Sequence, residues 1–494
     1  MKTVSFTLLW LFMSILTSNL ARAENRAPEY TRLMQNAETT PLCKIEGGTR
    51  KQILASYLLN LRKDYNLSIG YPGPPMNLAY VQREGALAFA SPQNVSRIID
   101  EISHFNINNA GDPFDTSGNF TSHSKYFEQS ILRYAAELYH LGQGTYWGYV
   151  LSGSTEGILF GLFQGRELLK KRYPGEANNI RVMSSSDSHY AIRKSAHILG
   201  VEFSGVKSQK NGEIDYADVE HQLSELKERG ALGPVIMNAN IGTTMKGAID
   251  SAQKLAQILG KYLPNDKYYI HADGAYYGAW LPLISPEKYG HVFKYAQSMN
   301  ISGHKTFGTA AITGILLTTK SSHDELMRDG RANAHVQYIG SRDTTMMSSR
   351  DGRNAVLLWE SIRLHGADGF KKIALNALAD AAWLKKQLLQ FVPSEHVTLN
   401  DDSIIVHIQY PDLKQIKNQN KRTKLQAEQK LIARKYQLAE SDEAMHIMCR
   451  AMVTRKTLNQ FLHDYRSFMD DYKSSQPLGQ KATPIALQLP QPGP

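Results

Sequence analysis

Short apolar runs alternate with amphipathic segments through the middle of the chain. Apolar side chains recur at helical spacing over residues 130–140, and residues 158–170 likewise predict a helix. Short apolar runs typical of buried strands lie at 147–151, 180–183, 235–237 and 268–270. Because strands that alternate with helices usually pair in parallel, the pattern predicts an α/β sheet covered by helices on both faces.

The pattern changes after residue 365. It then predicts a long helix, two strands and a closing helix, at 373–391, 403–409, 444–449 and 456–472. We therefore expect a large domain over residues 116–364 and a small C-terminal α+β domain over 365–473. The Pro- and Gln-rich remainder, 474–494, is expected to be disordered.

The N-terminus has the layout of a secretory signal peptide. Lys2 precedes an apolar stretch from Val4 to Leu16, and a small-x-small site follows at residues 21–23. This stretch is short for a membrane span, and we expect no span in the mature chain. The sequence predicts removal of residues 1–23 and export to a periplasm or the medium. An uncleaved anchor, a buried helix and a cytoplasmic protein stay open as alternatives.

Composition narrows the class of protein only a little. The chain has 494 residues, 42% of them hydrophobic and 21% charged, which is ordinary for a soluble globular protein of two or more packed units. Much of the net charge of +10 lies in the run 414–435, which we interpret as a solvated helix face. No zinc-finger spacing or aromatic RNA-binding motif accompanies it, so no nucleic-acid partner is expected. Cys43 and Cys449 are compatible with one bridge or with two free thiols.

Two motifs at predicted strand ends favour a cofactor with a reactive carbonyl group. Lys305 ends the motif SGHK at 302–305, and lysine is the residue that forms Schiff bases with carbonyl cofactors. Asp273 ends the motif HAD, directly after the run 268–270. A buried carboxylate needs a cationic partner, which a pyridinium nitrogen provides. A structural ion pair is the alternative. No metal site is expected, because further ligands at the usual spacings are missing.

Three more polar turns follow predicted strands. The first contains Gly153, Ser154 and Thr155 in a run of small residues, whose N–H groups and hydroxyls at a helix N-terminus suit a phosphate. The others contain His189 and Asn240. Ligands of open α/β sheets bind outside the carboxyl ends of the strands, so we expect these side chains to share one site. Taken alone, the first turn is equally compatible with ordinary turn chemistry, and a lone histidine is usually structural.

Together these motifs resemble those of the group II pyridoxal-phosphate decarboxylases, most closely the branch of histidine decarboxylases and plant serine decarboxylases. The resemblance extends from about residue 65 to residue 468. It is carried by ordered blocks, which read NLSIGYPG, WGYVLSGSTEG, SSDSHYAIRKSA, NGEIDY, NANIGTTMKGAID, YIHADGAYYG, SMNISGHKTFG and SRDTTMMSSRDGR.

The resemblance implies an aspartate-aminotransferase-like fold, fold type I, with a mostly parallel seven-stranded sheet in the large domain. It implies a homodimer, in which residues 24–115 pack on the partner subunit. It also implies pyridoxal 5'-phosphate as the cofactor and an L-amino acid as the substrate, which is converted to its amine and CO2. Within that reaction class, L-histidine is the first expectation, and serine or another amino acid is the alternative. A different reaction of the same cofactor and a non-catalytic exported binding protein also stay open.

The site residues follow from the same resemblance. Lys305 is expected to bind the cofactor as a Schiff base, Asp273 to pair with the ring nitrogen, and His189 to stack on the ring. The remaining expected cofactor ligands are Gly153, Ser154, Thr155, Asn240, Ser302 and His304. The resemblance places Tyr338 near the reacting carbon in a lid segment, and His189, Tyr71 and Ser348 on the substrate side.

The chain departs from the family pattern at several of these blocks. The family often has Gly and Asn where this chain has Ser154 and Ile158. It has Gly, Asn and His where this chain has Ser348, Asp351 and Arg353. These positions are expected near the substrate, so they leave the identity of the amino acid open.

Overall fold

The computed structural model describes residues 99–119, 121–309, 311–328, 335–451 and 453–476. All of them belong to one compact unit of the chain, residues 69–494. The predicted signal peptide, Cys43, Tyr71 and the C-terminal remainder after residue 476 lie outside the described residues. The domain bounds expected from the sequence therefore stay a prediction.

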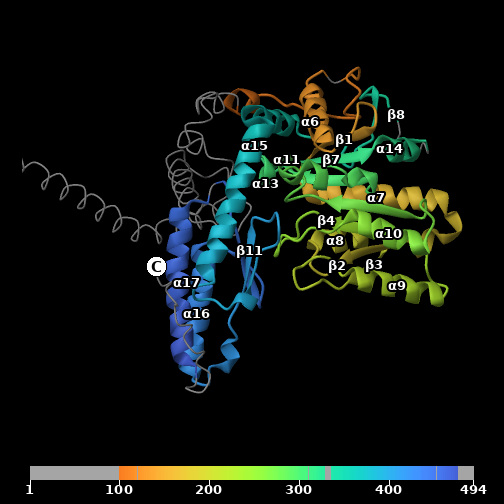
Figure 1. The fold of residues 1–494 in the computed structure, drawn as a ribbon. Coiled ribbons are helices and arrows are strands. Elements are labelled where there is room, and N and C mark those ends of the chain that lie inside the picture. The colour runs from red at the N-terminus through yellow and green to blue at the C-terminus, as the bar shows by residue number, and fades with distance from the viewer. Residues whose placement is uncertain (1–98, 120, 310, 329–334, 452, 477–494) are drawn as a thin grey trace, which may run out of the picture. The chain divides into compact units, whose positions relative to one another are not determined.

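A seven-stranded sheet lies between two layers of helices (Figure 1). Its spatial order is β1-β7-β6-β5-β4-β2-β3. The strands are β1 (Tyr146–Leu151), β2 (Arg181–Ser185), β3 (Glu202–Val206), β4 (Val235–Asn240), β5 (Tyr268–Asp273), β6 (Ser298–Ser302) and β7 (Gly314–Thr319). Neighbours from β3 through β6 pair in parallel, while β7 is antiparallel to both β6 and β1. The predicted mostly parallel, seven-stranded sheet is confirmed.

Helices cover both faces of this sheet, as the alternating pattern predicted. One face packs against α7 (Ser154–Arg172), α8 (Tyr190–Ile198) and α14 (Lys320–Met327). The other packs against α6 (Lys125–Leu138) and α10 (Ala252–Tyr262), with α9 (Tyr216–Glu228) beside α10. Short helices α11 (Leu281–Ile284), α12 (Pro286–Tyr289) and α13 (Gly303–Thr306) follow β5 and β6.

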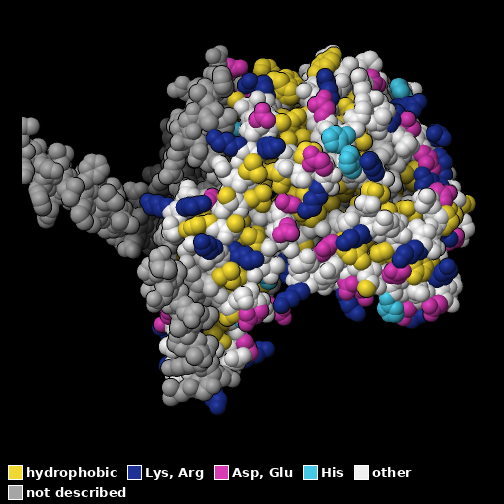
Figure 2. Space-filling model, viewed as in Figure 1, with side chains coloured by type: hydrophobic (Ala, Val, Ile, Leu, Met, Phe, Trp, Pro, Cys, Tyr) yellow, Lys and Arg dark blue, Asp and Glu magenta, His cyan; other side chains and the backbone are white. Residues whose placement is uncertain are grey.

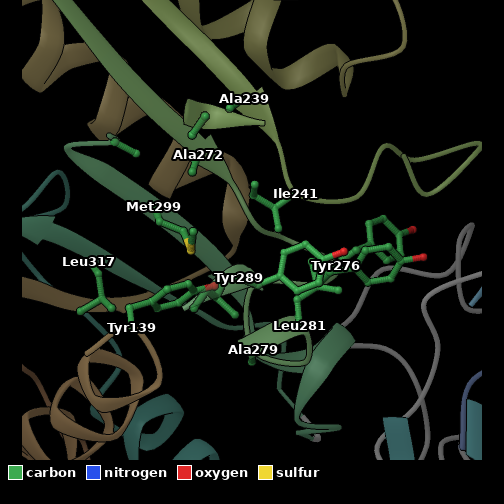
Figure 3. Close-up of a cluster of buried hydrophobic side chains, with 14 of the residues drawn as sticks. Tyr139, Ala239, Ile241, Ala272, Tyr276, Ala279, Leu281, Tyr289, Met299 and Leu317 are labelled. Atoms are coloured by element: carbon green, nitrogen blue, oxygen red, sulfur yellow. The ribbon is translucent and has the colours of Figure 1, made fainter. Parts of the chain in front are cut away.

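The face covered by α6 and α10 is apolar across the sheet. Ala239, Ala272, Met299 and Leu317 are register partners on four neighbouring strands, and all four are fully buried. Figure 3 shows this row together with the ring of Tyr139, which follows α6. Removing such a continuous apolar row from water stabilises the contact between helices and sheet.

A buried histidine of α14 packs against β1, which forms one edge of the sheet, and one of its ring nitrogens lacks a hydrogen-bond partner among the described residues. His323 of α14 stacks on Trp147 of β1, with ring centroids 3.9 Å apart and an interplanar angle of 10°. Its side chain is 4% exposed, and Nδ1 has no hydrogen-bond partner among the described residues. Burial lowers the pKa of His323 from 6.5 to about 4.

Replacing His323 by phenylalanine is expected to reduce the loss of unfolding free energy that occurs as the pH falls below 6.5. The unfolded state binds more protons than the folded state between pH 6.5 and pH 4, so the native chain loses stability as the pH falls through this window. The shift corresponds to about 3 kcal/mol at pH 4. His323→Phe keeps the stack on Trp147 and removes the titrating nitrogen. Urea unfolding at pH 7 and pH 4.5 measures the difference, and equal acid sensitivity of both proteins would contradict it.

The C-terminal part contains a second, antiparallel sheet. Its order is β10-β11-β13-β12, with β10 (Val397–Thr398), β11 (Ile405–Gln409), β12 (Ala439–Glu440) and β13 (Ala444–Met448). Helices α16 (Gln419–Lys435) and α17 (Arg455–Ser475) pack on each other, and α15 (Gly352–Leu388) contacts α6, β11 and α17 (Figure 1). A two-stranded ribbon of β8 (His335–Val336) and β9 (Ser341–Arg342) precedes α15.

The helix predicted at 373–391 begins earlier in the structure than the prediction placed it. Helix α15 begins at Gly352 and contains one non-helical residue, Gly366, with φ of 61° and ψ of −180°. The apolar periodicity before residue 366 was missed because this glycine interrupts it. Strands β3 and β7 were also not recognised, and β3 is half exposed and mixes polar and apolar residues.

The basic run forms a solvated helix face, as predicted. Helix α16 carries most of it, and only Leu425 and Ala433 of this helix are buried. Figure 2 shows Lys and Arg side chains interspersed with Asp and Glu side chains over the visible face. None of the helices in the described ranges is both long and apolar enough to cross a bilayer.

Candidate active site

A cavity of about 380 Å³ opens at the carboxyl ends of the strands. Residues from all five polar strand-end motifs line it. The expected site residues among them are Gly153, Ser154, Thr155, His189, Asn240, Asp273, Ser302, His304 and Lys305. The structure therefore brings together every expected cofactor ligand.

The sheet face covered by α7 changes from apolar to polar toward this cavity. Tyr269 on β5 and Ile236 on β4 lie in an apolar cluster under the helix. One pleat further on, Asn238, His271 and Ser298 are register partners, and the next row pairs Asn240, Asp273 and Asn300. Because alternate residues of a strand point to one face, both polar rows face α7. Polar side chains thus extend from the cavity wall into the sheet.

The turn before α7 is built to receive an anion. Gly153 precedes the helix, and no side chain of the described residues caps its first N–H groups. Glu156 accepts hydrogen bonds from the backbone N–H (2.8 Å) and the hydroxyl (2.7 Å) of Ser152, which fixes the turn. The Ser154 and Ser302 hydroxyls lie 2.6 Å apart at the cavity. Unfilled N–H groups at a helix N-terminus, together with hydroxyls, form a phosphate site.

Gly153→Ala is expected to weaken binding of the phosphate-bearing cofactor about tenfold to a hundredfold. Gly153 has φ of 158° and ψ of 159°, a conformation that only glycine adopts without a cost of about 1–3 kcal/mol. Titration of the cofactor-free chain with cofactor measures the change. Gly175→Ala is the matched control, because a Cβ there meets no described atom within 4 Å. Equal affinity of both variants would contradict the assignment of this turn.

Lys305 lies on the short helix α13, directly after β6. Its Nζ lies 4.3 Å from the ring centroid of Tyr276, which also lines the cavity. Burial lowers the pKa of the Lys305 amine, while the nearby Asp273 carboxylate opposes that shift. A lowered pKa favours the neutral amine, which is the form that attacks a carbonyl carbon.

Asp273 presents one carboxylate oxygen to the cavity. Its side chain is 6% exposed. Oδ1 accepts hydrogen bonds from Asn300 Nδ2 (2.9 Å) and from the backbone N–H of Ala275 (3.2 Å). Oδ2 accepts none from the residues that the structure describes, which leaves it available to a protonated ring nitrogen.

His189 is held in one tautomer at the start of α8. Its Nδ1 accepts a hydrogen bond from the backbone N–H of Ala191 at 3.3 Å, so Nε2 carries the proton. Burial lowers the pKa of His189, although Asp273 opposes the shift, and the ring is therefore neutral near pH 7. A neutral aromatic ring at the cavity is suited to packing against a flat cofactor.

The side chain of Asn240 is directed back into the sheet. Its Nδ2 donates to Asp250 Oδ2 at 2.7 Å and to Ser185 Oγ at 3.2 Å, and its Oδ1 accepts from Asn238 at 3.0 Å. Asp250 is buried, and burial raises its pKa to about 7. Sequence reasoning missed Asp250, although its place ten residues after Asn240, across a tight turn, was a usable signal.

Tyr338 and Ser348 do not line this cavity. Tyr338 lies between β8 and β9, with 72% of its surface exposed, and Ser348 is exposed in the segment before α15. Asp351 accepts a hydrogen bond from the backbone N–H of Arg353 and forms an ion pair with its side chain at the start of α15. Two of the departures from the family pattern in this segment, Asp351 and Arg353, thus pair with each other.

Comparison with known proteins gives a consistent result. A family model, the pyridoxal-dependent decarboxylase conserved domain, matches residues 126–409. The histidine decarboxylase of Solanum lycopersicum is 34% identical over 83% of this chain and 87% of its own length. The chain belongs to the pyridoxal-dependent decarboxylase family. It is an enzyme, a carboxy-lyase that acts on an amino acid and uses pyridoxal 5'-phosphate.

Two further comparisons bear on substrate and fold. Serine decarboxylase 3 of Oryza sativa subsp. japonica is 33% identical over 74% of this decarboxylase and 74% of its own length. The L-methionine decarboxylase of Streptomyces sp.590 superimposes with a TM-score of 0.69 at 21% identity, covering 87% of this chain and 96% of the other. The latter likeness identifies the fold, which is fold type I of the pyridoxal-phosphate enzymes, as predicted.

The cavity of the decarboxylase fits this cofactor. The uncapped start of α7 and the hydroxyls of Ser154 and Ser302 match its phosphate. The free Oδ2 of Asp273 matches a protonated ring nitrogen, and the partly buried amine of Lys305 matches its aldehyde. Sequence reasoning did not single out several residues of the same wall, which are Glu156, Tyr276 and Ile312. Tyr276 could have been found from the sequence, since it follows Asp273 by three positions within the motif YIHADGAYYG.

Proposed function

We propose that this decarboxylase converts L-histidine to histamine and CO2. The observation that carries the decarboxylation is the convergence of Lys305, Asp273 and His189 on one cavity beside an anion-binding helix start. Likeness to the tomato histidine decarboxylase along most of both chains supports histidine as the substrate. Nearly equal likeness to the rice enzyme supports serine as the second candidate.

Each residue has a distinct role in this proposal. The helix start and the two serine hydroxyls bind the phosphate. Asp273 Oδ2 would hold a proton at the ring nitrogen, where the cofactor would supply an acceptor for the electron pair that the departing carboxylate leaves. Lys305 Nζ, favoured in its neutral form by burial, would bind the aldehyde carbon of the cofactor. The neutral ring of His189 confines the flat ring and keeps Nε2–H directed for hydrogen bonding.

Separate incubation of the cofactor-loaded protein with L-histidine, L-serine and the other common amino acids tests this function. CO2 release and the mass of the amine are measured together. We expect the highest kcat/KM for L-histidine, with histamine as the product. A preference for serine, with ethanolamine as the product, would overturn the choice of histidine and keep decarboxylation. Bound cofactor without CO2 from any amino acid would overturn decarboxylation itself.

We propose further that the active unit is a homodimer in which Tyr338 reaches the partner's cavity. Tyr338 lies outside the cavity of its own chain and is highly exposed, and Ile312 at the cavity wall is 68% exposed. A partner subunit at these positions would remove both apolar side chains from water. Mixing of Lys305→Ala and Tyr338→Phe subunits tests whether Tyr338 serves the partner's cavity. In the mixed dimer, one cavity would then combine an intact Lys305 with an intact Tyr338 from the other subunit. Recovery of activity in the mixed dimer is expected, and a monomer by sedimentation, or no recovery, would contradict it.

Export is the remaining proposal, and the N-terminal layout of Lys2, the apolar stretch 4–16 and the site 21–23 supports it. The full chain with its own N-terminus is expressed in a secreting host, and the N-terminus of the product is sequenced. We expect exported protein that begins at Glu24. Protein that begins at Met1 in the cytoplasm would contradict export.

A further inference from the structure

A chain of buried polar groups lies behind the carboxylate of Asp273. Ser298 Oγ lies 2.8 Å from His271 Nδ1, and His271 Nε2 lies 2.8 Å from Asn300 Oδ1. Asn300 Nδ2 lies 2.9 Å from Asp273 Oδ1. Ser298, His271 and Asn300 are all fully buried, and none of them lines the cavity. Of the cavity residues, only Asp273 is reached by their side-chain hydrogen bonds.

The direction of these hydrogen bonds follows from the carboxylate. An ionised Asp273 only accepts, so Asn300 directs its amide N–H groups to it and its Oδ1 to His271. His271 must then donate a hydrogen bond through Nε2 and accept one from the Ser298 hydroxyl at Nδ1. Burial lowers the pKa of His271 to about 4, which keeps the ring neutral in this tautomer. Every hydrogen bond in the chain points toward Asp273, and such aligned bonds reinforce one another.

Helix α7 packs closely over the hydrogen-bonded row of Ser298, His271 and Asn300. A Cβ on Gly161 would lie 2.2 Å from His271 Nδ1, and a Cβ on Gly157 would lie 2.6 Å from the Cβ of Asn300. Only glycine permits so close an approach of a helix to these two side chains. The approach holds the imidazole and the amide in a single orientation, because well-packed side chains have no room for other rotamers.

We propose that Asn300 and His271 are positioning residues, which fix Asp273 Oδ1 and thereby aim Oδ2 at the ring nitrogen of the cofactor. The inference rests on the proposed role of Asp273. With Oδ1 bound by Asn300 and by the backbone of Ala275, the carboxylate cannot rotate freely, and Oδ2 remains directed into the cavity. Groups of this kind, one shell away from the chemistry, keep a reactive group in its productive geometry.

A cofactor analogue whose ring nitrogen is replaced by carbon separates positioning from a merely structural role. The cofactor-free full chain is titrated with pyridoxal phosphate and with the analogue. Asn300→Leu is expected to weaken pyridoxal phosphate about tenfold, the effect of losing a hydrogen bond to a charged group, and to change the affinity for the analogue little. His271→Leu should behave in the same way. His271→Gln, which still offers an N–H to Asn300, should retain most of the affinity.

Gln164→Leu is the matched control. Gln164 is a fully buried amide of α7 that accepts hydrogen bonds from Tyr269 and Thr318 and, among the described residues, shares no hydrogen bond with Asp273. It should affect both ligands equally or not at all. Equal losses of both ligands in Asn300→Leu would overturn the positioning role. If Asp273→Asn also showed no preference between the two ligands, the assignment of Asp273 to the ring nitrogen would fail as well.

Thermal unfolding of each variant, measured without cofactor, shows whether it is folded. If Asn300→Leu does not fold, His271→Leu and His271→Gln decide the question by themselves, since they differ only in the donor offered to Asn300. Equal affinity of these two variants for pyridoxal phosphate would overturn the proposal.

Discussion

Replacement of Lys305 by alanine is expected to lower the rate of amino-acid decarboxylation by about 10³-fold or more. Among the described residues that line the cavity, Lys305 provides the only amine, which lies beside Tyr276 and near the Asp273 carboxylate. An enzyme that loses the side chain that binds its cofactor covalently commonly loses several powers of ten in rate. The phosphate turn is untouched, so cofactor binding should weaken much less than the rate. CO2 release and cofactor titration, measured on the same preparation, give both quantities.

Lys254→Ala is the control for this variant, because Lys254 is an exposed lysine of α10 that does not line the cavity. It should retain the native rate. The visible absorption of bound cofactor should shift in Lys305→Ala and not in Lys254→Ala. A Lys305→Ala enzyme that decarboxylates at a native rate would contradict the assignment of the cofactor lysine.

The largest expected effect on stability comes from Glu128. Its side chain is fully buried, forms an ion pair with Arg350 and also accepts hydrogen bonds from the Val150 N–H (2.7 Å) and from Asn109 (3.0 Å). Glu128→Gln leaves the Arg350 guanidinium buried without its counter-charge. Breaking a buried ion pair on one side costs about 3–5 kcal/mol. The free energy of unfolding in urea should fall by this amount.

Glu220→Gln is the control for Glu128→Gln. Glu220 pairs with Lys261 at 2.8 Å on the surface, with side chains 40% and 56% exposed, and such pairs contribute about 1 kcal/mol or less. Val150 lies three residues before Gly153, so Glu128→Gln should also weaken cofactor binding. Equal stability of the two variants would contradict the predicted cost of breaking the buried Glu128–Arg350 pair.

The sequence predicted the edge of the sheet where the site lies and the side chains that line it. Gly153, His189, Asn240, Asp273 and Lys305 each follow a short apolar run, and parallel strands bring such positions to one edge. This inference needs only local patterns and one rule of topology. The same reasoning predicted helices on both faces, which the structure confirms.

The polar side chains behind the cavity were harder to predict. His271, Asn300 and Asp250 lie inside strands or after a turn, where a polar residue is ordinarily assigned to a solvated face. Alternation within β5 and β6 did carry a signal, because His271 and Asn300 share the parity of Asp273 and Ser302 respectively. Their partners come from different strands, and register is not visible in local patterns.

The position of Tyr338 illustrates a different limit. Its place in the chain indicated a loop, and β8 and β9 do enclose it as a short ribbon. Whether such a loop serves its own cavity or another depends on the assembly of subunits, which local periodicity does not encode. The structure places it away from its own cavity, which motivates the subunit-mixing experiment.

Borohydride reduction of the cofactor-loaded protein, followed by peptide mass mapping, tests the central assignment most directly. The hydride reduces the carbon–nitrogen double bond between cofactor and lysine, so the cofactor stays attached to the side chain that bound it. We expect the added mass on the peptide that contains Lys305 and on no other peptide. A label on a different lysine, or no label while cofactor remains bound, would contradict the site described at the strand ends.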